Sequence, residues 1–195
     1  METTRLAIDW VHELKDQLDW HWRHQLRPGL EGLTDEEYFW EPVPDCWNVR
    51  RRGTSSAPIA AGGGDFTIDF ALPEPVPPPV TTIAWRLGHI IVGVLGTRAA
   101  AHFGAPATDY GSHHYAGTAA GALAQLDEVY GHWTDGVARL DTEGLAQPCG
   151  PAEDAFAEWP LASLVLHINR EVIHHGAEIM LLRDLYRSRA GWSSS

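Results

Sequence analysis

The stretch HINREVIHHGAEI, residues 167–179, places three histidines and two glutamates among residues that are typical of a helix interior. At about 100° per residue of an α-helix, the five side chains fall within an arc of about 100°: His167, Glu171, His174, His175 and Glu178. Leucines lie on the same arc before and after them, so we expect the arc to point inward. Burial of these groups without compensation would be costly, and a divalent cation is one effective compensation.

The stretch belongs to a long helix that the sequence predicts over residues 160–187, because Pro160 suits the first position of a helix. Apolar residues also recur at helical spacing in three further segments, residues 4–26, 81–103 and 118–140. Four long amphipathic helices predict an all-α fold, an antiparallel four-helix bundle. We expect one domain over residues 1–190 and a disordered tail over residues 191–195.

Residues 43–80 form the least helical part of the sequence and separate the first two predicted helices. CWNVR (46–50) and FTIDF (66–70) read as two short strands, with a stretch rich in glycine and serine between them. We therefore predict a loop or small hairpin excursion from the helices in this region.

The composition excludes several classes of protein. A formal net charge of -12 over 195 residues disfavours nucleic acid and anionic lipid as partners. No apolar run reaches the length of about 18 residues that spans a membrane. The N-terminal METTRLAIDW lacks an apolar signal core, which predicts a cytoplasmic protein. Cys46 and Cys149 are far apart and form no CxxC pair, so neither a disulfide framework nor a cysteine-rich zinc site is indicated.

Glu171 and His175 are the strongest candidates for metal ligands, since a spacing of four residues can direct two side chains to one ion. His167 lies about 12 Å from His175 along the helix axis, so a third ligand should come from another helix. The lone His89 of TTIAWRLGHIIVGVLG is the candidate, and Gly93 and Gly96 beside it leave space for a ligand or for close helix approach. A satisfied core histidine is the alternative for His89, and a contribution from His167 instead stays open.

The proposed ligand set is His89, Glu171 and His175, two histidines and one carboxylate. This set occurs in catalytic zinc centres that keep a fourth position open for water or substrate. Nickel, iron and manganese accept the same ligands, so the set predicts a divalent ion, zinc first, without identifying it.

The two motifs WRLGHI (85–90) and REVIHHGAEI (170–179) resemble those of the DinB-type metal-binding bundle family. The family commonly has HxxxHRGQ on its last helix, whereas this chain has Glu171 in place of the first histidine and Glu178 in place of the glutamine. The resulting ExxxH pair is similar to the mycothiol-dependent maleylpyruvate isomerase branch. The resemblance implies a bundle of DinB type with His89, Glu171 and His175 as the metal ligands.

The resemblance also implies a metal-dependent thiol S-transferase or isomerase, which would use a low-molecular-weight thiol of the mycothiol kind and a small electrophile. We take His174 and Glu178 as candidate catalytic residues, and Trp85 and His21 as candidates to line the binding pocket. Two alternatives stay open: a metal-dependent hydrolase, with His174 or Glu178 as the base, and a non-catalytic bundle with a buried His/Glu network. The oligomeric state, including a homodimer, is also left open.

Overall fold

The first helical segment begins at an aspartate cap. The computed structural model describes residues 7–189, and in it the side chain of Asp9 accepts a hydrogen bond from the backbone N–H of His12 at 3.1 Å. The segment runs through α1 (Trp10–His21), a π-helical stretch η1 (Trp22–Leu26) and the single turn α2 (Arg27–Gly29). Helix formation was predicted from residue 4, and residues 4–6 lie outside the described residues.

The second helical segment contains a longer π-helical stretch. It comprises α4 (Ile83–His89), η2 (Ile90–Gly96) and α5 (Thr97–Phe103), close to the predicted 81–103. Thr82 caps its beginning by accepting from the N–H of Trp85 at 3.2 Å. Gly104, in the left-handed conformation with φ 72°, ends it, because a residue without Cβ adopts this conformation at little cost.

The last two long helices are continuous. α6 (Ala119–Ala138) starts at a Thr118 cap, and α8 (Leu161–Ser188) follows Pro160, so both lie near the predicted ranges 118–140 and 160–187. Shorter helical turns connect the long segments: α3 (Asp35–Tyr38), α7 (Thr142–Ala146) and the 3-10 helix η3 (Pro151–Phe156). The predicted tail, residues 191–195, lies outside the described residues.

The prediction of an all-α fold is wrong, because residues 49–70 form a three-stranded antiparallel sheet. Its strands are β1 (Val49–Arg51), β2 (Ile59–Ala61) and β3 (Phe66–Phe70), in the order β1-β3-β2. The two predicted strands do pair, with Val49 opposite Ile68. The strand that sequence reasoning missed, β2, pairs along the other edge of β3. It is only three residues long and lies in the stretch rich in glycine and serine, so no alternation of apolar and polar residues indicated it.

The sheet is held against the second helical segment by polar side chains. The buried carboxylate of Asp69 accepts from the backbone N–H of Asn48 at 3.0 Å and from Nε of Arg50 at 2.8 Å. Nε1 of Trp85 donates to the carbonyl oxygen of Asp69 at 2.8 Å. Buried polar groups cost free energy unless they are paired, and here the pairing joins β3 to α4.

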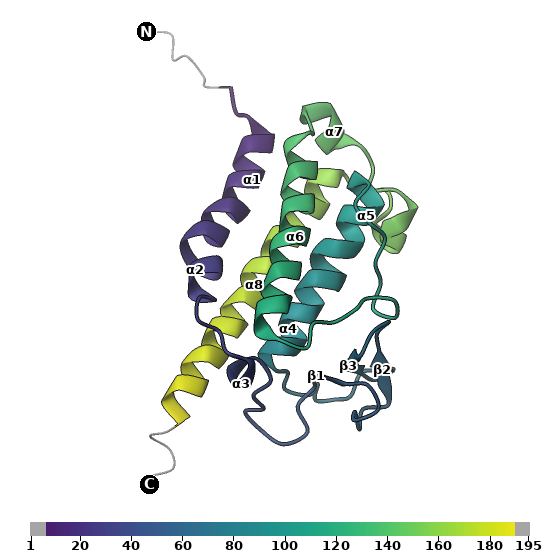
Figure 1. The fold of residues 1–195 in the computed structure, drawn as a ribbon. Coiled ribbons are helices and arrows are strands. Elements are labelled where there is room, and N and C mark those ends of the chain that lie inside the picture. Colours follow the sequence, from purple (N-terminus) through teal and green to yellow (C-terminus); the bar gives the residue numbers. More distant parts are fainter. Residues whose placement is uncertain (1–6, 190–195) are drawn as a thin grey trace.

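The predicted antiparallel arrangement is also wrong as stated. In Figure 1, α1 and α8 run from the top of the view to the bottom, whereas α4–α5 and α6 both run upward. The neighbouring pairs α1/α8 and η2/α6 are therefore parallel. The long connection over residues 104–118 makes this order necessary, because it returns the chain from the end of α5 to the sheet end of the molecule before α6 begins. Among the helices of residues 7–189, none is both long enough and apolar enough to cross a membrane.

Candidate metal centre

His89, the last residue of α4, is packed between two aromatic side chains. The ring of Trp85 stacks on it with centroids 5.3 Å apart and planes at 15°. On its other side, the hydroxyl of Tyr110 lies 2.7 Å from Nδ1 of His89. π-Helical stretches such as η2, which begins at the next residue, are frequent at functional sites.

Gly93 makes the contact between Tyr110 and His89 possible. A Cβ atom at residue 93 would lie 1.9 Å from the Tyr110 hydroxyl, far inside any allowed contact. The expected space for a ligand beside Gly93 is therefore filled by a tyrosine side chain, and that beside Gly96 by Thr108. Neither predicted use, space for a ligand or close approach of a helix, is what these contacts show, since both side chains come from the connection over residues 104–118.

His175 projects from α8 toward His89. The two rings meet edge to face, with centroids 4.8 Å apart and planes at 87°. Nδ1 of His175 lies 2.7 Å from Oε2 of Glu178, whereas Nη1 of Arg86 lies 3.3 Å from the same nitrogen. The shorter contact assigns the proton to Nδ1, which donates to the carboxylate and leaves Nε2 with a free electron pair.

Glu171 completes the predicted ligand set on the Nε2 side of His175. Its Oε2 lies 3.6 Å from that nitrogen. Within residues 7–189, neither Nε2 of His175 nor Nε2 of His89 makes a hydrogen bond. Nδ1 of His89 can donate to the Tyr110 oxygen, because a phenol oxygen accepts as well as donates. Each imidazole thus has its Nδ1 held by a partner and its Nε2 available, which is the usual arrangement of metal-binding histidines.

The electrostatic surroundings keep both imidazoles neutral. Burial, with smaller effects of His175, Arg86 and Arg98, lowers the pKa of His89 to about 3. Burial also lowers the pKa of His175, although the hydrogen bond to Glu178 opposes the shift. A histidine must be neutral to bind a metal, so both are in the correct protonation state at neutral pH.

A second group of metal-ligand atoms lies on the outer side of His175. Within the described residues, His174, His175 and Glu178 have ligand atoms that all lie within 4.8 Å of one another. This outer group could hold a metal ion. Nε of Arg86 lies 3.1 Å from Oε2 of Glu178, however, so a guanidinium already supplies positive charge there.

The expectation that the whole His/Glu arc points inward is only partly correct. The side chain of His175 is 10% exposed, but those of His174 and His167 are 61% and 43% exposed. At about 100° per residue, the most deeply buried positions of α8, such as Val172 and Ile179, are centred about 90° away from the middle of the arc. The arc therefore borders the buried face of the helix, and only His175 lies fully within that face.

The remaining predicted residues have distinct positions. Trp85 is buried and forms one wall around His89. His21 is also buried, with Nδ1 2.8 Å from Oε1 of Gln25, and its unpartnered Nε2 would lie 3.2 Å from a Cβ at Gly176. It thus packs against α8 one residue beyond His175. His167 lies 3.5 Å from Oε1 of Glu171, at the edge of the centre.

Sequence reasoning missed two residues of the centre, Arg86 and Tyr110. Arg86 precedes His89 by three residues, which places both on one face of α4, so a close inspection of WRLGHI could have suggested it. Tyr110 lies in the connection between α5 and α6, where no periodicity indicates which way a side chain points.

The comparisons with known proteins add a family. The family described as the DinB superfamily matches residues 17–179 of the chain. The matched range includes α4 and the part of α8 that carries Glu171, His175 and Glu178. Neither the comparison with curated proteins nor that with solved structures found a match.

Proposed function

The chain belongs to the DinB superfamily, and from this premise we propose that it is a metal-dependent thiol S-transferase or isomerase. The proposed ligands are Nε2 of His89, Nε2 of His175 and the carboxylate of Glu171. The observation that carries the proposal is the approach of the two imidazoles, 4.8 Å between ring centroids, with both Nδ1 atoms engaged elsewhere. Zinc is the first candidate for the ion.

The inner ligand set is favoured over the outer one by charge and by tautomer. The outer set would use Nδ1 of His175 and Glu178, and both are already engaged with each other and with Arg86. A second cation at that place would be repelled by the guanidinium. We therefore assign Glu178 and Arg86 a positioning role, holding His175 so that Nε2 faces Glu171.

A divalent ion bound there would supply positive charge that lowers the pKa of a coordinating thiol. The thiol has to come from a co-substrate, because burial raises the pKa of both Cys46 and Cys149 and makes them poor nucleophiles. In the transfer, the thiol sulfur supplies the electron pair for a new bond to carbon, and the leaving group departs with the pair of the broken bond. His174, exposed beside Glu178, is the proposed acceptor of the thiol proton.

A non-catalytic network is the competing interpretation, and one observation favours it. Arg86, Glu178 and His175 already satisfy one another within 2.7 to 3.3 Å. In such a network the guanidinium group compensates the negative charge of the carboxylate, so no metal ion is needed for that purpose. The two interpretations differ in what they predict for Nε2 of His89 and His175, which the network leaves without partners.

The test is thiol transfer by untagged protein, with and without stoichiometric zinc. Low-molecular-weight thiols are incubated with a panel of electrophiles, and thioether formation is followed by mass spectrometry. We expect conjugation in the presence of zinc and a rate near background after chelation. Equal rates in the two preparations for every thiol would reject the transferase and leave the network interpretation.

A further inference from the structure

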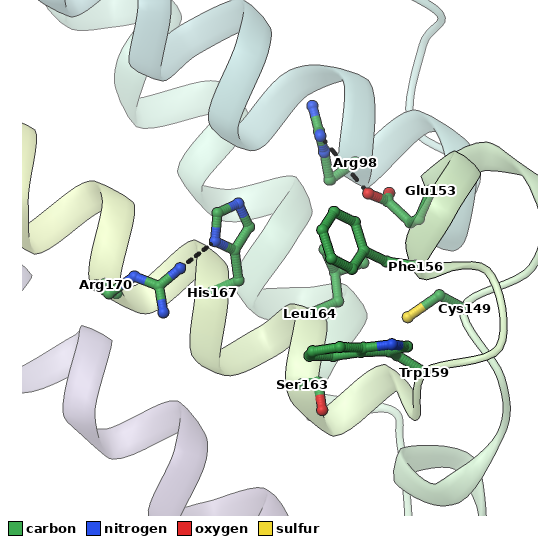
Figure 2. Close-up of a pocket in the computed structure, with 9 residues that line it drawn as sticks. All are labelled: Arg98, Cys149, Glu153, Phe156, Trp159, Ser163, Leu164, His167 and Arg170. Atoms are coloured by element: carbon green, nitrogen blue, oxygen red, sulfur yellow. Dashed lines mark hydrogen bonds and ion pairs between the residues drawn. The ribbon is translucent and has the colours of Figure 1, made fainter.

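A cavity of about 400 Å³ lies beside the candidate metal centre (Figure 2). It is enclosed by α5, the connection between α7 and α8, and the first turns of α8. A volume of this size suits a small organic ligand, since ligand pockets commonly measure about 300–1,000 Å³. Of the residues considered for the site from sequence, His167 alone lines it.

One half of the cavity is an aromatic corner. Phe156 and Trp159 have ring centroids 5.3 Å apart with planes at 84°, and they are 57% and 54% exposed. In Figure 2, the Trp159 ring is seen edge-on, with Phe156 and Leu164 on the same side of it. Large aromatic side chains left in contact with water at a concave site indicate a surface that a flat apolar ligand can cover.

The other half of the cavity is lined by charged side chains. Arg98 and Arg170 contribute two guanidinium groups and Glu153 contributes one carboxylate, and Nε of Arg170 lies 3.4 Å from Oε1 of Glu171. That carboxylate is shared, since it lies 2.9 Å from Nε2 of His102 and 3.5 Å from Nη2 of Arg98. Nε of Arg98 is buried without a hydrogen-bond partner. This unpartnered donor of a charged group favours an anionic group on the ligand.

The cavity adjoins the metal centre along α8. His167 lies on its wall, and Nδ1 of His167 is 3.5 Å from Oε1 of Glu171. Four residues of helix correspond to about 6 Å along the axis. On the opposite side, Nη1 of Arg98 donates to the carbonyl oxygen of Gly93 at 2.6 Å, one turn beyond His89. A molecule held in the cavity would therefore lie next to the proposed ligands.

We propose that the cavity binds a small aromatic carboxylate, with its ring on Trp159 and Phe156 and its carboxylate toward Arg98 and Arg170. Its role as the electrophilic substrate rests on the proposed transferase function, whereas its binding does not. The cavity is assigned to the electrophile because its aromatic corner suits a flat ring.

The test is direct binding of 2-naphthoate to the full-length protein in the presence of a chelator, measured by isothermal titration. The uncharged 2-naphthamide serves as the comparison ligand, because it has the same ring without the negative charge. We expect 2-naphthoate to bind at least about 10-fold more tightly, as one charge-assisted contact is worth roughly that factor. Trp159→Ala and Arg170→Gln should each weaken its binding about 5-fold or more.

Two exposed residues elsewhere provide matched controls. Trp20→Ala removes a tryptophan that is 52% exposed on α1, and Arg139→Gln removes an arginine exposed at the end of α6. Both should leave the affinity for 2-naphthoate unchanged. Equal affinities for the acid and the amide, or binding that is insensitive to Trp159→Ala, would overturn the proposal.

The outcome is separable from that of the transferase assay. Binding of 2-naphthoate without zinc-dependent transfer would retain the site and reject the enzyme function. If the protein shows zinc-dependent transfer but binds 2-naphthoate and 2-naphthamide equally well, the transferase function stands and the proposed carboxylate site is rejected.

Discussion

The ring of His175 meets the ring of His89 edge to face. Nδ1 of His175 is held by Glu178, and Nδ1 of His89 is held by Tyr110. The two Nε2 atoms are thereby left for a common ligand. Glu178 and Tyr110 act on orientation and tautomer, so their removal should affect metal binding less than removal of a ligand.

This difference gives the first prediction. His89→Ala and His175→Ala should each lower the affinity for zinc by at least about 100-fold, because each removes a ligand. Glu178→Gln should lower it by about 10- to 100-fold, the usual effect of a residue that orients a ligand. Zinc titration of untagged protein measures all three, with His24→Ala, which removes an exposed histidine of η1, as the control. An unchanged affinity in His89→Ala would exclude that residue from the site.

Gly93 should be intolerant of a side chain for a local reason. Gly93→Ala places a Cβ on the hydroxyl of Tyr110, and overpacking of this kind lowers the free energy of unfolding by about 1–3 kcal/mol. Gly131→Ala in α6 is the matched control, because a Cβ there meets nothing within 4 Å. That substitution should stabilise the protein by about 0.5–1 kcal/mol through helix propensity.

A second background isolates the clash between residue 93 and Tyr110. In Tyr110→Ala protein the obstacle is absent, so adding Gly93→Ala should cost little or be stabilising, as at Gly131. Urea denaturation of the two single variants and the double variant gives the coupling free energy. Additive effects would show that the strain at Gly93 arises elsewhere.

Asp19 predicts a pH dependence of stability. Burial alone would raise the pKa of Asp19, but hydrogen bonds from Lys15 and Tyr130 hold it below the ordinary 3.8. A lowered folded-state pKa stabilises the protein above the unfolded-state pKa, and this contribution is lost as the pH falls through the folded-state pKa. Asp19→Asn should therefore lower the free energy of unfolding by about 1.5–3 kcal/mol at neutral pH.

The difference between wild type and Asp19→Asn should shrink as the pH falls below 3.8, the ordinary pKa of the group. Thermal unfolding followed by circular dichroism over a pH series measures this. Asp16→Asn, an exposed carboxylate of the same helix, should show no such difference. A constant difference across the series would mean that the ionised carboxylate is not the source of the stabilisation.

The helices could be predicted because their signals are local. Apolar residues recur every three to four positions along each helix. The helix ends are marked by neighbouring residues, the caps Thr82 and Thr118 and the terminating Gly104. The sheet was only half predictable, since β2 is short. The buried carboxylate of Asp69 in β3 is satisfied by the backbone N–H of Asn48 and the side chain of Arg50, which no alternation pattern reveals.

The site was predictable to the extent that its residues lie on helices. The spacing of Glu171 and His175 and the isolated position of His89 in an apolar run led to three residues that the fold brings close together. Tyr110 was not predictable, because a loop residue reaches His89 only through the tertiary path of residues 104–118. The exposure of His174 was misjudged, because a helical arc computed from polar residues does not show where the buried face is centred.

The choice between the inner and outer ligand sets gives the last prediction. Glu171 belongs to the inner set alone and His174 to the outer set alone, whereas His175 belongs to both. If the ion lies between His89 and His175, Glu171→Gln should weaken zinc binding by at least about 10-fold while retaining the fold, and His174→Ala should leave the affinity unchanged. If the ion is held by the outer set, His174→Ala should weaken zinc binding and Glu171→Gln should leave the affinity unchanged. In that case Arg86→Gln should strengthen zinc binding, because it removes a competing cation. Titration of the three variants with zinc, with circular dichroism to confirm folding, decides which nitrogen of His175 binds the metal.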